Sequence, residues 1–207
     1  VFSLHPVKII TTGEGGLCVT NNKKVFEKML ICKNNGITSE NKKFISKNLG
    51  PWYYEQHDLG YNFRISEIQA ALGLSQLKKL KIFVRKRNQI AKVYIKNFKT
   101  LPLDVQKIDK KFTSTYHLFI IKLKKHKTHL HLKLFNYLRN NKIFVNLHYL
   151  PVHLHPYFQK RGFKNKIFPI SETYSKSAMS IPVYPNLKKK EQLRVIFLIK
   201  KFFKIND

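Results

Sequence analysis

Lys8 is the first residue of the chain whose surroundings suggest covalent chemistry. It lies in the least charged part of the sequence, between Val7 and the pair Ile9 and Ile10. A lysine amine among apolar side chains is desolvated, which favours its neutral form and makes it a usable nucleophile. By its pattern alone, however, it is better interpreted as a strand lysine that points to solvent, because lysines are abundant throughout the chain.

Nine histidines raise the question of a metal site. Two pairs are spaced two residues apart, His129 with His131 and His153 with His155. Residues at this spacing do not share a helix face, and no carboxylate cluster accompanies either pair. We therefore predict no metal site. The glycines at 13–16 indicate a turn rather than a nucleotide-binding fingerprint.

The composition is that of a folded protein. With 207 residues, of which 43% are hydrophobic, the chain suffices for one large or two small domains. Cys18 and Cys32 cannot form the disulfide framework of a small secreted domain, so we predict a reducing, cytoplasmic location. The longest apolar run, Val195–Ile199, is far shorter than a membrane-spanning helix requires.

The net charge of +29 invites the hypothesis of a basic module that binds nucleic acid or another polyanion. Only six of the 40 basic residues are Arg, the side chain suited to bidentate phosphate contacts. The lysines are spread over the whole length together with abundant Asn and Ile. We attribute the charge to coding bias and predict no nucleic-acid or membrane partner, and the polyanion-binding module is the alternative function.

The elements that must position these residues begin with a predicted β-hairpin over 7–20, whose turn is the glycine-rich segment 13–16. Asn21 or Asn22 then caps a helix that ends near Gly36. Residues 37–63 are predicted to be a loop, and its many aromatic side chains favour a partner surface or a substrate.

Ser66 and Gln69 form a capping-box pattern, which predicts the start of a long helical region. Apolar residues recur there at helical spacing and predict one buried face with Lys and Arg opposite: Leu77, Leu80, Val84, Ala91, Tyr94 and Phe98.

Leu101 and Pro102 end this region, and a second unit follows. We predict a strand over 116–123, a helix over 131–140, a strand over 144–148 and a final helix. Leu193, Ile196 and Phe203 would share one face of that last helix. The predicted domains are therefore 1–100 and 101–207, the second a small α/β domain.

Three stretches resemble one known family in the same order. They are FSLHPVKIITTGEGG at 2–16, a segment beginning GPWYYEQ at 50 and continuing with LGYNFRISEIQAALG at 59–73, and VNLHYLPVH at 145–153. Together they resemble the DegT/DnrJ/EryC1/StrS family of sugar-nucleotide aminotransferases, and within it the branch of pseudaminic acid biosynthesis. The resemblance implies an α/β fold, the C-terminal part of a fold type I transferase that depends on pyridoxal phosphate (PLP).

By this resemblance Lys8 would bind the cofactor covalently and then shuttle the proton between substrate and cofactor. Ser3 would hydrogen-bond the cofactor phosphate. Asn62 corresponds to the residue that reaches the phosphate from the partner subunit, which implies a homodimer with shared sites. Residues 1–100 would then comprise the tail of the large domain, the dimer loop and a long helix.

The resemblance also implies a sugar-nucleotide substrate and an amino-acid donor, with glutamate expected. The acceptor would be C4 of a UDP-linked 4-keto-6-deoxy-N-acetyl-hexosamine. His148, Tyr149 and His153 lie where the family contacts the sugar nucleotide. Arg64 is a further candidate ligand, although an ion pair or a contact at the start of a helix fits it equally well.

In this family the acidic partner of the cofactor ring, the phosphate-binding turn and the ring-stacking residue all precede the lysine. Only seven residues precede Lys8 here. We therefore expect the chain to be the C-terminal half of such an enzyme, or slightly more, and to be inactive alone. A non-catalytic remnant that still dimerises is a further alternative.

Overall fold

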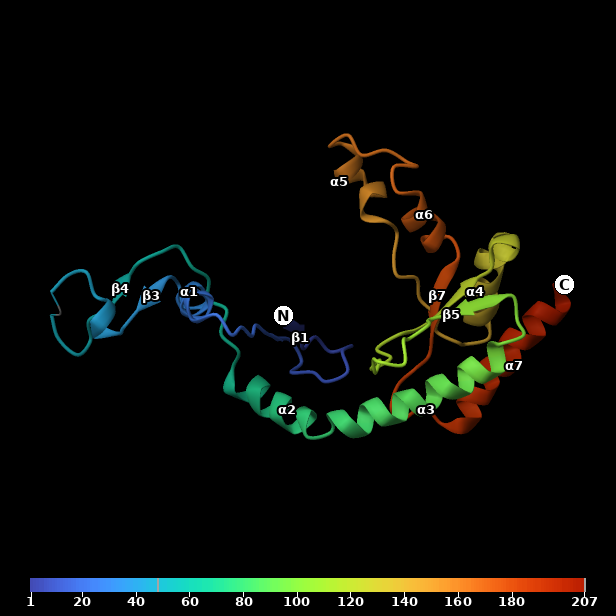
Figure 1. Cartoon of the computed structure of the whole chain (residues 1–207), viewed down its shortest axis with the longest axis horizontal. Coiled ribbons are helices and arrows are strands. Elements are labelled where there is room, and N and C mark those ends of the chain that lie inside the picture. The colour runs from blue at the N-terminus through green and yellow to red at the C-terminus, as the bar shows by residue number, and fades with distance from the viewer. Residues whose placement is uncertain (48, 207) are drawn as a thin grey trace. The chain divides into compact units, whose positions relative to one another are not determined.

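The computed structural model describes residues 1–47 and 49–206, which form two compact units. Unit 1 comprises residues 1–80, and unit 2 begins at residue 81. The elements of both are shown in Figure 1. Within the described residues, no helix combines the length and the apolar character needed to cross a membrane.

Unit 1 contains two α-helices joined by irregular chain and two small antiparallel sheets. Its elements are β1 (Phe2–Ser3), β2 (Gly16–Leu17), α1 (Lys23–Lys33), β3 (Ile37–Thr38), the 3-10 helix η1 (Asn41–Lys43), β4 (Glu55–Gln56) and α2 (Glu67–Leu77). β1 pairs with β2, and β3 pairs with β4.

Helix α1 begins and ends where its capping residues predict. The Asn22 side chain accepts a hydrogen bond from the Val25 N–H at 3.2 Å, which satisfies one of the free amides of the first turn. At the other end Gly36 adopts a φ of 75° and donates its N–H to Ile31 O at 3.0 Å. The predicted helix and its cap are confirmed.

The predicted hairpin over 7–20 is wrong in its first strand. Ser3, not a residue of 7–12, lies opposite Gly16, and Thr12 donates its N–H back to Leu4 O at 3.0 Å. The β-prone run at 7–12 therefore belongs to a loop that is closed at Leu4, whose C=O accepts from Thr12 and whose N–H donates to Gly15.

The long helical region is two helices. The capping box at Ser66 is present, but α2 ends at Leu77 and α3 (Leu80–Phe98) starts after a short break. Leu77 is 52% exposed, so it does not belong to the buried stripe that was predicted for it.

The described residues of unit 2 form a three-stranded antiparallel sheet and several helices. Besides α3, unit 2 contains β5 (Leu103–Val105), β6 (Phe119–Leu123), η2 (Lys125–Leu130), α4 (His131–Asn140), η3 (Val152–Leu154), α5 (Pro156–Gln159), α6 (Pro169–Ser175), β7 (Ala178–Ile181) and α7 (Lys189–Ile205). The strand order is β5-β6-β7, so Ile121 lies opposite both Val105 and Met179.

One continuous core joins the sheet to α3, α4 and α7 of unit 2. Tyr94, Ile121, Leu134 and Ile199 are each fully buried in it. Helix α7 runs alongside α3 (Figure 1), and Gln192 of α7 donates to Ile90 O at 2.8 Å. Three of the predicted stripe residues of α3, namely Ala91, Tyr94 and Phe98, are buried as expected.

Three further expectations for unit 2 need correction. Residues 144–148 do not form a strand: within this range only Asn146 forms a bridge, to Ser180 of β7. Leu193 is 49% exposed, because the buried face of α7 is rotated toward Val195. Arg87 is buried although the helical pattern predicted that the basic residues of α3 face solvent.

The helix predicted over 131–140 is confirmed as α4, and the strand predicted from 116 begins at Phe119. The domain boundary near residue 100 stays a prediction. In the structure α3 is grouped, from Lys81 onward, with the core of unit 2.

Candidate functional site

Lys8 lies on a loop that is closed at its base by main-chain hydrogen bonds. We call residues 5–11 the lysine loop. At its base Leu4 N–H donates to Gly15 O at 2.9 Å, and Leu4 O accepts from the Thr12 N–H at 3.0 Å and from the Thr11 hydroxyl at 2.9 Å. Lys8 itself donates its N–H to His5 O at 3.0 Å, so the loop turns just before the lysine. The side chain of Lys8 is half-buried.

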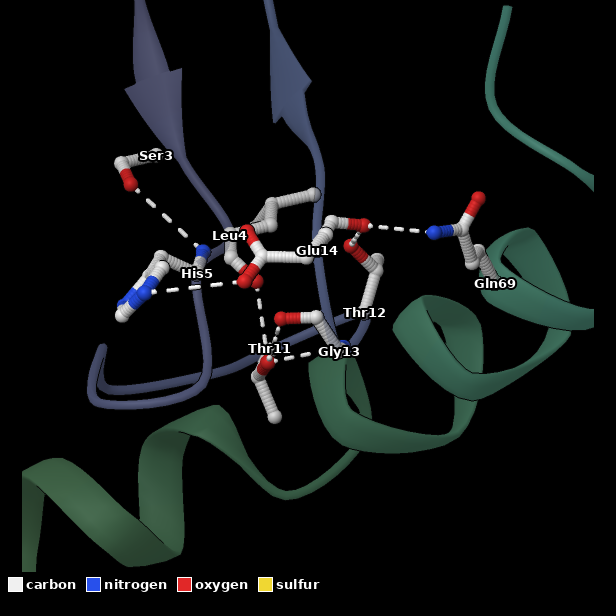
Figure 2. Close-up of polar contacts among 8 residues, drawn as sticks. All are labelled: Ser3, Leu4, His5, Thr11, Thr12, Gly13, Glu14 and Gln69. Carbon is white, nitrogen blue, oxygen red and sulfur yellow. Dashed lines mark hydrogen bonds and ion pairs between the residues drawn. The ribbon is translucent and has the colours of Figure 1, made fainter.

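Thr12 fixes the base of the lysine loop against helix α2. Its side chain is 2% exposed, and its hydroxyl donates to Glu14 O at 2.7 Å. The same Glu14 carbonyl accepts a hydrogen bond of 3.1 Å from the Gln69 side chain of α2 (Figure 2). A Cβ placed on Gly73, one turn further along α2, would lie 2.8 Å from the Thr12 methyl. The glycine is thus what permits this close approach of helix and loop.

Ser3 and Lys8 both bond to His5, Ser3 through its side chain and Lys8 through its main chain. Ser3 stands immediately before the base of the lysine loop, and its Oγ accepts a hydrogen bond from the His5 N–H at 3.5 Å (Figure 2). The hydroxyl proton of Ser3 stays available as a donor, because the bond to His5 uses only an oxygen lone pair. His5 also lies 3.6 Å from the Glu14 carboxylate, an exposed pair that links the two sides of the base.

Asn62 and Arg64 lie together on the segment that leads into α2. The Arg64 Nε donates to Asn62 Oδ1 at 2.9 Å. Since the amide oxygen is engaged, the Asn62 NH₂ group faces elsewhere as a double donor, which suits an anionic oxygen such as that of a phosphate. Both residues line a pocket of about 740 Å³ with Lys33, Leu17 and neighbouring apolar side chains of unit 1.

His148 and Tyr149 lie in unit 2, where the chain leaves the bridge at Asn146. The His148 Nε2 is hydrogen-bonded to Ser180 Oγ at 2.7 Å. The rings of His148 and Tyr149 pack edge to face, with their centroids 4.8 Å apart. Burial lowers the pKa of His148, so the neutral imidazole is favoured. The Tyr149 side chain is 70% exposed and can reach a ligand.

His153 is buried and paired rather than open. Its Nε2 is hydrogen-bonded to Glu172 Oε1 at 2.9 Å, and the same carboxylate oxygen accepts the Lys166 N–H at 2.7 Å. The hydrogen bond from His153 holds the pKa of Glu172 below its ordinary value, with the bond from Lys166 acting in the same direction. This pair closes the segment 153–172, which carries α5 and the first residues of α6 (Figure 1).

Three residues of this arrangement were not identified from the sequence as site residues. Gln69 was noted only as a helix cap, although its amide can donate as well as accept and could have indicated a second hydrogen bond. Thr12 was assigned to a strand. Glu172 carried no local signal, because its partner His153 lies 19 residues away.

The histidine pairs are not gathered into a metal site. His131 is hydrogen-bonded to Ala178 O at 3.0 Å, and His153 to Glu172. No group of three or more His, Cys, Asp or Glu suited to a metal ion was found among residues 1–47 and 49–206.

Comparison with known proteins agrees with the sequence motifs. Residues 1–200 match the model of the DegT/DnrJ/EryC1/StrS aminotransferase family. The UDP-4-amino-4,6-dideoxy-N-acetyl-beta-L-altrosamine transaminase of Campylobacter jejuni is 33% identical over 92% of this chain and 48% of its own length. The chain thus spans about half the length of the curated relatives it matches.

Solved structures confirm the predicted fold class. Helicobacter pylori PseC, an aminotransferase of pseudaminic acid biosynthesis, superimposes with a TM-score of 0.84 at 29% identity, over 98% of this chain and 52% of its own. A sugar aminotransferase from Streptococcus pneumoniae, solved in its PMP form, gives a TM-score of 0.86 at 24% identity, over 97% and 51% of the two chains. The two units have the fold of the corresponding half of these enzymes.

Proposed function

Because the chain belongs to the DegT/DnrJ/EryC1/StrS aminotransferase family, we propose that it contributes Lys8 and its surroundings to a PLP-dependent sugar-nucleotide aminotransferase. The reaction moves an amino group from glutamate to C4 of a UDP-linked 4-keto-6-deoxy-N-acetyl-hexosamine. The keto oxygen of the sugar leaves as water, and a water oxygen becomes the keto oxygen of 2-oxoglutarate. The relatives of pseudaminic acid biosynthesis support this choice of substrate.

The lysine loop is the observation that carries the proposal. It carries Lys8, a half-buried residue, and a serine hydroxyl lies beside the base of the same loop. PLP, when bound, supplies an aldehyde for the amine and a ring that delocalises electrons. Lys8 would hold this cofactor and move a proton at the reacting carbon, whereas Ser3 would donate its hydroxyl hydrogen to the phosphate.

The remaining predicted residues would act on phosphate and sugar. Asn62 would donate its NH₂ group to the cofactor phosphate, in the orientation that Arg64 fixes. Arg64, Tyr149 and His148 offer a cation, a phenol and an imidazole to the sugar nucleotide. His153 would affect the substrate indirectly, because its hydrogen bond to Glu172 holds the segment 153–172 in place.

We also propose that the enzyme is a homodimer with shared sites and works in the cytoplasm. Asn62 and Arg64 line the pocket of unit 1, and its lining residues do not include Ser3 or Lys8. This arrangement supports a site in which Asn62 serves the lysine loop of a second subunit. The acidic partner and the phosphate-binding turn that the family places before the lysine are not among the 207 residues, so we propose that these residues alone do not turn over substrate.

Lys8 labelling tests the proposal directly. The chain is incubated with PLP, reduced with borohydride and mapped by peptide mass spectrometry. We expect the label to concentrate on Lys8, and a Lys8→Arg variant to lose this preference while its exposed lysines are labelled as before. Label distributed over the lysines according to their exposure would contradict the assignment. Size-exclusion mass at several concentrations tests the dimer.

A further inference from the structure

The side-chain amide of Gln69 forms hydrogen bonds both to the N-terminal cap of α2 and to the base of the lysine loop. Its Oε1 accepts the Ser66 N–H at 3.0 Å and completes the cap of α2. Its Nε2 donates to Glu14 O at 3.1 Å, across 55 residues of sequence (Figure 2). We propose that Gln69 is a positioning residue for the lysine loop. The proposal rests on the proposed function only for the role that it gives to Lys8.

The donor half of the Gln69 amide is not needed for the cap. A capping box requires an acceptor at this position, and Glu supplies one as well as Gln does. Only an amide can also donate a hydrogen bond to a carbonyl. The presence of Gln, with its NH₂ group directed at Glu14 O, therefore indicates a second task beyond helix capping.

Gln69 and Thr12 act on the same carbonyl. Glu14 O accepts from the Gln69 amide at 3.1 Å and from the Thr12 hydroxyl at 2.7 Å. Thr12 in turn donates its N–H to Leu4 O, so a shift of the Glu14 carbonyl is transmitted to both sides of the base. The hydrogen bond from Gln69 and the contact between Thr12 and Gly73 attach the loop base to α2 at two points. Two points of attachment prevent the base from rotating on the helix.

The attachment also fixes Lys8 relative to the segment before α2. Ser66 caps the helix through Gln69, and Arg64 and Asn62 lie two and four residues before Ser66. One side chain thus ties the loop with the reactive amine to the segment that we assign to phosphate and substrate. Loss of the bond to Glu14 should misplace the amine while the helix stays intact.

Two substitutions separate the two tasks of Gln69. Gln69→Glu keeps the acceptor for the cap and removes the donor, whereas Gln69→Lys keeps a donor and removes the acceptor. Gln76→Glu, with the same charge change further along α2, is the matched control, since none of the described residues forms a side-chain hydrogen bond with Gln76. The readouts are PLP labelling of Lys8 after borohydride reduction and amide hydrogen exchange.

For Gln69→Glu we expect Lys8 labelling to fall about fivefold, the factor for one lost hydrogen bond. Exchange at the Thr12 amide should rise by a similar factor, and exchange at the Ala70 amide in the first turn of α2 should stay unchanged. Gln69→Lys should show the converse, with Lys8 labelling largely retained and Ala70 less protected. Labelling would respond to placement of the amine, which a role in helix capping alone would not alter.

Thr12 exchange in Gln69→Glu equal to that of the wild type would overturn the positioning role. So would a fall in Lys8 labelling of the same size in Gln76→Glu, because charge alone would then explain it. If the wild-type chain shows no preference for Lys8, the proposed function fails, and the Thr12 exchange still decides the inference.

Discussion

Substitution of Gly73 by Ala tests how closely the lysine loop sits on α2. The added Cβ would lie 2.8 Å from the Thr12 methyl, which is too close for two carbon atoms. At an open helix position Gly→Ala stabilises by about 1 kcal/mol. Here Thr12 cannot move away, because it is 2% exposed and rotation of its side chain would break the bond to Glu14 O. Overpacking costs about 1–3 kcal/mol, so we expect a net loss of about 1 kcal/mol.

The assay is amide hydrogen exchange at Leu4 and Thr12, whose N–H groups close the base of the loop. A loss of about 1 kcal/mol corresponds to about fivefold faster exchange. Thr12→Ser keeps the hydroxyl and removes the methyl, so Gly73→Ala should cost nothing further in that background. Ala71→Gly, at an exposed position of α2, measures the effect of the Ala-to-Gly difference in helix propensity without a change in packing. Slower exchange in Gly73→Ala would refute the close contact.

Two further predictions concern unit 2. Arg87 donates from one nitrogen to Tyr116 O, His117 O and Val183 O at 3.0, 3.2 and 2.8 Å. Arg87→Met should therefore lower the free energy of unfolding in urea by about 2–4 kcal/mol. Arg85→Met, on the exposed side of the same helix, should change it by less than about 0.5 kcal/mol, and equal effects of the two substitutions would contradict the prediction. The lowered pKa of Glu172 means that its stabilisation is present above the ordinary value of 4.5 and is lost as the pH falls below it. Exchange at the Lys166 amide, corrected for its intrinsic pH dependence, should therefore rise on acidification in the wild type and not in Glu172→Gln, and parallel profiles would argue against the pair.

Local signals were enough to place several helix ends. Asn22 and Ser66 cap their helices through hydrogen bonds to residues three positions away, and α4 occupies the predicted range. Such bonds depend on a few neighbouring residues, so the sequence specifies them directly. The three motifs likewise indicated the family, and the family match to residues 1–200 agrees with them.

Distant partners decided what the local pattern left open. Residues 7–12 have strand-like composition, yet Leu4 and Gly15 hold the base of a loop there. Arg87 falls on a helix with exposed basic residues and is buried because three carbonyls converge on it, one of them 96 residues away. β-propensity describes what a residue tolerates, and the neighbouring chain decides which hydrogen bonds it makes.

The candidate site shows the same division. Through their resemblance to the family, the motifs indicated Lys8 as the candidate amine and Ser3, Asn62 and Arg64 as further candidates. Only the tertiary structure revealed that Gln69 joins the loop to α2, and that His153 is paired with Glu172. The physical reason is that the chemistry of a side chain is fixed by its type, whereas its orientation is fixed by partners that folding brings from distant parts of the chain.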